Sequence, residues 1–89
     1  RERMAVTREA YCWQCHQKMN PPGLTFESYD HYGRFRTAEL NKPVDSTGLI
    51  EKAGDPAVEG SYPDAVTMLK KLAATDRARQ VFIRHMFRY

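Results

Sequence analysis

Cys12-Trp13-Gln14-Cys15-His16 is the stretch that decides how this 89-residue chain folds. It has the form C-x-x-C-H, the pattern at which haem c is attached. If the stretch is helical, residues three and four positions apart share one face, so both thiols and the imidazole point the same way. The thiols can then add across the two haem vinyl groups, and the imidazole can bind the iron. The motif therefore predicts one covalently bound haem c, attached at Cys12 and Cys15, with His16 as the proximal ligand.

Two other kinds of site use paired cysteines, and both remain alternatives. A redox dithiol of the thioredoxin kind normally opens a helix within a βαβ unit, but no β-rich run precedes Cys12. A closed zinc site needs four ligands, commonly from a second paired cluster. The other two histidines, His31 and His85, are far apart in the sequence and form no such pair. We therefore favour haem attachment.

The composition is that of one small globular domain, residues 1–89. Hydrophobic residues make up 42% and charged residues 28% of the chain, which is ordinary for a soluble protein. A chain of this length is marginally stable without a staple, and a covalently held haem would act as one. The net charge of +3 is spread along the chain, with no basic run longer than two residues. This pattern favours a solvated surface over a nucleic-acid site, and no apolar stretch approaches the ~20 residues of a membrane span.

Helix signals surround the motif in the first third of the chain. We expect a first helix over 8–18, with Thr7 as its N-cap. Asn20-Pro21-Pro22-Gly23 is expected to stop it sharply. A short helical piece is expected over 25–31, closed by Gly33.

The rest of the chain divides into an irregular middle and two further helices. Residues 34–50 are expected to be extended, as a small hairpin or an irregular excursion, and 51–62 to be a loop. Pro63 suits the first position of a third helix, and Thr75 or Asp76 can cap the last one. The last helix carries an apolar stripe at helical spacing, formed by Ala78, Val81, Phe82, His85, Met86 and Tyr89. The expected fold is mostly α, with about four helices and a loop-rich or short-hairpin middle.

A six-coordinate haem needs a second ligand on the face opposite His16. Met68 is the first candidate, because it follows the motif after a long loop and precedes the last helix; if it is not a ligand, it packs with its neighbouring leucines. His85 is the second candidate, because it lies on the apolar stripe. Met86, another ligand or an open site remain alternatives. Three other residues are discounted as distal ligands. Met4 and Met19 lie on the His16 side, and Met19 is expected to fill the core. His31 is expected to face solvent.

Further contacts to the cofactor can be proposed from neighbouring residues. A ligating histidine usually donates its other N–H to a carbonyl or carboxylate, and the backbone carbonyls of 20–22, including that of Pro22, are close in sequence. The haem propionates are expected to be held by Trp13, Tyr32, Arg34 and Arg36, unless these side chains form an exposed and solvated set. Glu27 and Asp30 are close enough in sequence to the two arginines to pin this loop by ion pairs.

The sequence also resembles a known family. Residues 12–36 read C-W-Q-C-H-Q-K-M-N-P-P-G-L-T-F-E-S-Y-D-H-Y-G-R-F-R. This is similar to the pattern C-x-x-C-H-x-x-M-[DN]-P-x-G-x-x-x-E-x-[FY]-D-x-x-G-R-[FWY]-R of planctomycete-type cytochrome domains, once described as domains of unknown function. Residues 43–48 and 81–89 resemble later elements of that family. The resemblance implies a small cytochrome c-like domain within a larger exported protein, in the periplasm or a similar compartment.

The expected activity follows from the cofactor. A single haem c would pass electrons to a redox partner protein or to other domains of the same polypeptide. No general base or nucleophile stands beside the motif, so we do not expect an enzyme. Two alternatives remain, a haem-based sensor with an open distal site and a module in which the haem is mainly a structural staple.

Overall fold

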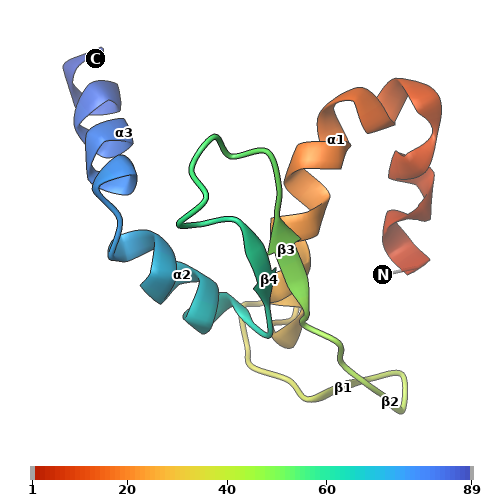
Figure 1. The fold of residues 1–89 in the computed structure, drawn as a ribbon. Coiled ribbons are helices and arrows are strands. Elements are labelled where there is room, and N and C mark those ends of the chain that lie inside the picture. Colours follow the sequence, from red (N-terminus) through yellow and green to blue (C-terminus); the bar gives the residue numbers. More distant parts are fainter. Residues whose placement is uncertain (1, 89) are drawn as a thin grey trace.

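The computed structural model describes residues 2–88, with only the backbone for residues 2 and 3. Figure 1 shows the order of the elements along the chain. They are η1 (Glu2–Arg8), α1 (Ala10–Gly23), η2 (Leu24–Ser28), β1 (Ala38–Glu39), β2 (Lys42–Pro43), β3 (Gly48–Ile50), β4 (Gly60–Tyr62), α2 (Ala65–Ala73) and α3 (Asp76–Phe87). The 3₁₀ segment η1 and helix α1 lie on one side of the β3–β4 hairpin, and α2 and α3 lie on the other (Figure 1).

The fold is a small mixture of helices and sheets, so the prediction of a mostly α domain with about four helices was wrong. Residues 2–88 contain three α-helices and two antiparallel sheets of two strands each. The expected helix over 25–31 is only the 3₁₀ segment η2, because Tyr29 leaves the helical conformation and forms a bridge with Phe35. The expected loop over 51–62 ends in strand β4, whose Gly60–Tyr62 pairs with Gly48–Ile50.

Helix α1 begins later and ends later than the sequence suggests. Its N-cap is Glu9, which makes no side-chain cap bond, whereas Thr7 lies within η1. The helix continues through Pro21 and Pro22 to Gly23. Proline lacks an N–H but its fixed φ is helical, so the helix survives at the cost of two hydrogen bonds. The N–H of Leu24 closes its end by donating to carbonyls of the last turn.

Strand β3 lies against this proline-containing end of α1. A Cβ atom added to Gly48 would collide with the Pro21 carbonyl oxygen and would lie 2.7 Å from Cγ2 of Thr25. Glycine is therefore required here by the close approach of two backbones. Because Thr25 is fully buried, this contact joins the β3–β4 hairpin to both α1 and η2.

The core is small and lies between η2, β4 and α2. Its buried apolar side chains are Val58, Tyr62, Ala65 and Met68. The hydroxyl of Tyr62 donates to the Val58 carbonyl, so the one polar atom of this tyrosine is satisfied inside the core.

Helix α2 starts at Ala65, two residues later than expected. Asp64, not Pro63, controls its beginning, because the Asp64 carboxylate accepts the N–H of Thr67 at 2.7 Å. Of the two predicted caps of α3, Thr75 and Asp76, it is Thr75 that caps the helix, accepting the Ala78 N–H at 3.3 Å.

Helix α3 contributes no buried side chain. The apolar stripe predicted on it is present but exposed, with Phe82 68% and Met86 64% accessible. Tyr89, the last member of the predicted stripe, lies outside the described residues.

Candidate functional site

Helix α1 presents the motif side chains on one face. Cys12, Cys15 and His16 occupy positions i, i+3 and i+4 of a regular helix, so their side chains project in similar directions. Cys12 and His16 are half-buried, Cys15 is exposed, and both thiols are free. Met19 continues this face and is 53% exposed, so the expectation that it fills the core was wrong. The face is thus open to a flat ligand.

A hydrogen-bonded chain orients the imidazole of His16. Its Nδ1 atom lies 3.0 Å from Oδ1 of Asn20, one helical turn further along α1. The Nδ2 of Asn20 donates to Oγ1 of Thr7 at 2.7 Å. The hydroxyl of Thr7 donates in turn to the carbonyl of Met4 at 2.6 Å. Because Nδ1 is engaged, Nε2 is the ring nitrogen left for a ligand.

The acceptor for His16 differs from the backbone carbonyls suggested by the sequence. The Pro22 carbonyl accepts instead from the Thr25 hydroxyl at 2.7 Å, and that of Asn20 accepts from the Leu24 N–H. The sequence did carry a signal for the observed partner, because an amide four residues after a histidine lies beside it on a helix.

A cavity of about 240 Å³ lies between η1, α1 and β3. Trp13 and Asn20 line it on α1, so it borders the helix face next to that of the thiols. Its volume is below the ~300 Å³ at which ligand pockets usually begin, so it is too small to enclose a haem. Arg8 contributes a positive charge to its lining.

The two arginines proposed for propionates are held by carboxylates of their own loop. Arg36 is half-buried and pairs with Glu27 at 3.5 Å and with Glu39 at 3.2 Å. Arg34 pairs with Asp30 at 3.1 Å. The predicted ion-pair network is therefore confirmed.

Asp30 organises the turn in this loop. Its carboxylate accepts the backbone N–H groups of Arg34 and Tyr32, and these bonds, that of Arg34 first, hold the pKa of Asp30 below its usual range. Gly33 closes the turn in a left-handed conformation with φ of 79°, where a side chain would be strained. The guanidinium of Arg34 lies 5.0 Å from the ring centre of Tyr32.

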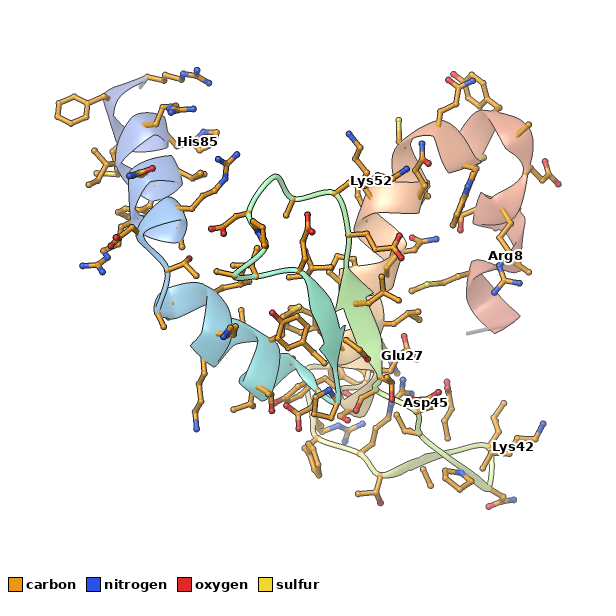
Figure 2. All side chains as sticks on the ribbon, in the orientation of Figure 1. Arg8, Glu27, Lys42, Asp45, Lys52 and His85 are labelled. Carbon is orange, nitrogen blue, oxygen red and sulfur yellow. The ribbon has the colours of Figure 1, made fainter. Side chains whose placement is uncertain are left out.

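Of the two candidate distal ligands, Met68 is buried and His85 is exposed. Met68 is 4% exposed, and its sulfur lies 3.7 Å from Oγ1 of the buried Thr25, whose hydroxyl donates to the Pro22 carbonyl. Its thioether is thus engaged in the core against η2. Figure 2 shows His85 on α3, across the β3–β4 hairpin from α1. His85 and Met86 are exposed, and so is His31, as expected. The distal ligand stays a prediction.

The described part of the chain, residues 2–88, offers neither a cluster of metal ligands nor a membrane-spanning helix. The described side chains form no group of three or more His, Cys, Asp or Glu able to hold a metal ion. None of the helices in this part of the chain has the length and apolar character needed to cross a bilayer.

The first part of the chain matches a family model. Residues 1–39 match PSCyt3, described as a protein of unknown function (DUF1588). The name supports the resemblance to planctomycete-type cytochrome domains over η1, α1, η2 and the loop up to β1. No curated protein and no solved structure matches the chain. The elements that carry Met68 and His85 lie outside the matched residues.

Proposed function

We propose that this chain is a c-type cytochrome domain that binds one haem through Cys12, Cys15 and His16 and transfers electrons. The observation that carries the proposal is the placement of these three side chains on one open face of α1, with Nε2 of His16 left for the iron. The match of residues 1–39 to PSCyt3 supports it.

The residues present fit a covalently held haem. Two free thiols stand three positions apart on a helix, and an imidazole follows at once. When bound, haem c supplies one-electron exchange at its iron, tuned by its ligands and their hydrogen bonds. Cys12 and Cys15 would anchor it, and His16 would bind it from the α1 side.

Because the core is small, a bound haem would also stabilise the fold. Four apolar side chains are buried in the described part of the chain, which is little for a domain that folds alone. The exposed side chains on the thiol face of α1 can bury apolar area against a large flat ring. We therefore expect the haem-loaded chain to be more stable than the haem-free one.

The setting of this activity follows from the same proposal. Covalent attachment at C-x-x-C-H points to an exported protein, and the resemblance to planctomycete-type cytochrome domains implies that the domain is one part of a longer polypeptide. Its electrons would pass to a redox partner or to other domains of that polypeptide, and no catalytic role is assigned to the chain itself.

An open distal site is the second candidate function. It is favoured by the burial of Met68 against Thr25 and by the position of His85 on α3. Such a haem would bind small ligands and suit a sensor. Carbon monoxide added to the ferrous protein separates the two functions, because rapid binding requires a vacant or weakly held sixth position.

The test of haem attachment is expression in a host that matures c-type cytochromes, followed by intact mass measurement. The chain and a His31→Ala control should both carry the mass of one haem that resists acid–acetone extraction. A variant with both Cys12→Ser and Cys15→Ser should lack it. If the wild-type chain shows only its polypeptide mass, with both thiols open to alkylation, the proposed function is wrong.

A further inference from the structure

We propose that Thr7 and Asn20 are the positioning residues of His16, and that together they hold its imidazole with the proton on Nδ1. The inference rests on the proposed function for its consequence at the iron. The hydrogen-bonded chain itself is a property of the polypeptide. It joins η1 to α1 across 13 residues.

The direction of each hydrogen bond follows from the last acceptor. The carbonyl of Met4 can only accept, so the Thr7 hydroxyl must donate to it. The Thr7 oxygen then receives a hydrogen from the amide of Asn20, which must turn its NH₂ group toward Thr7. The other end of that amide is a carbonyl oxygen, and it faces Nδ1 of His16 at 3.0 Å.

A carbonyl oxygen has no proton to give, so Nδ1 of His16 must donate. The neutral ring then has its lone pair on Nε2, the form that binds a metal. Without Thr7, the two ends of the Asn20 amide would be free to exchange, because among the described residues the amide bonds only to Thr7 and His16. Thr7 therefore selects the orientation of Asn20, and Asn20 selects the tautomer of His16.

Burial makes this selection effective. All three bonds are part-buried, and a partly buried polar group that loses its partner is harder for water to satisfy. A hydrogen-bond acceptor on Nδ1, here Oδ1 of Asn20, also increases the electron donation of a ligating imidazole to its metal. Removing it should favour the ferrous state and raise the reduction potential, and a carboxylate in its place should lower it.

The experiment compares the reduction potentials of haem-loaded variants. Asn20→Leu removes the acceptor at similar size, and Asn20→Asp makes it anionic. Thr7→Val removes the hydroxyl, and Thr7→Ser is the matched control that keeps it. Loss of an outer partner of a metal-binding histidine typically costs about 10–100-fold in metal affinity or activity. A tenfold difference between the ferric and ferrous states corresponds to about 59 mV for one electron. We expect Asn20→Leu to raise the potential by about this amount, Thr7→Val to raise it less, Asn20→Asp to lower it, and Thr7→Ser to leave it unchanged.

Two results with covalently loaded protein would overturn the inference. One is a wild-type potential in Asn20→Leu. The other is an unchanged potential in Thr7→Val while Asn20→Leu shifts, which would remove Thr7 from the role.

A second measurement stands apart from haem binding. Nitrogen-15 NMR of the haem-free chain at alkaline pH should show His16 with its proton on Nδ1 in the wild type and in Thr7→Ser, and a mixture of tautomers in Thr7→Val. A proton on Nε2 in the wild type would reject the inference. If the wild-type chain carries no haem, the proposed function fails and this measurement still decides the inference.

Discussion

Replacing Gly48 with alanine should destabilise the chain, although alanine is normally the more stabilising residue. The added Cβ would meet the Pro21 carbonyl oxygen and would stand 2.7 Å from Cγ2 and 3.1 Å from the backbone nitrogen of Thr25. Two of these three atoms are backbone, and Thr25 is fully buried. None can move aside without separating β3 from α1 or shifting η2.

The magnitude follows from opposing effects. Overpacking a tight site costs about 1–3 kcal/mol, and the rigid neighbours place Gly48→Ala in the upper part of that range. The smaller entropy of the unfolded alanine chain returns only about 0.4–1 kcal/mol. We therefore expect a net loss in the free energy of unfolding of about 1–2 kcal/mol, as a difference of these two terms.

Gly23→Ala is the matched control. Gly23 has helical angles (φ −60°, ψ −30°), and a Cβ there would meet nothing within 4 Å. The same chemical change should therefore stabilise the haem-free chain by about 0.4–1 kcal/mol.

Urea denaturation of the haem-free wild type and both variants, followed by circular dichroism, measures these changes as shifts of the midpoint. The reasoning is refuted if Gly48→Ala unfolds at the same or a higher urea concentration than the wild type.

Three further predictions concern the second half of the chain. Met68→Leu conserves volume and should lower the free energy of unfolding by less than about 1.5 kcal/mol, whereas Met68→Ala should lower it by about 2–5 kcal/mol. Urea denaturation measures both changes. A change of haem spin state in the leucine variant would mark Met68 as an iron ligand. Thr75→Ala should cost about 1 kcal/mol by removing the cap of α3, with Thr75→Ser close to the wild type. Hydrogen bonds from Thr67, helped by the charge of Lys70, lower the pKa of Asp64 from its usual 3.8. A lowered folded-state pKa gives stability that is present above 3.8 and lost as pH falls through the folded value. The wild type should therefore exceed Asp64→Asn at neutral pH and lose this advantage in acid; an advantage that persists at the lowest pH would contradict this assignment.

Features within one or two helical turns could be predicted from the sequence. The helix under the motif, the Thr75 cap and the turn at Gly33 depend on spacings of a few residues. The ion pairs that join Arg34 and Arg36 to Asp30 and Glu27 are also local. For these features the chain needs no distant partner.

The sequence-based predictions were wrong where a distant segment decides the local structure or its burial. The proline pair was expected to end α1, but β3 and η2 hold that end of the helix in place. Residues 60–62 have little strand character of their own and form β4 by pairing with β3. The stripe on α3 has helical spacing, but periodicity does not say what covers it, and the described elements leave it exposed.

The sequence by itself determined the donor set, because C-x-x-C-H places two thiols and an imidazole on one side of any helix that contains it. Only the tertiary structure brought Thr7 to Asn20, the hydrogen-bond partner of His16, because these two residues meet when η1 folds back on α1. It also placed Met68 against Thr25, 43 residues away in the chain. Local spacing sets the direction in which a side chain points, whereas its partners depend on which distant segments pack against it.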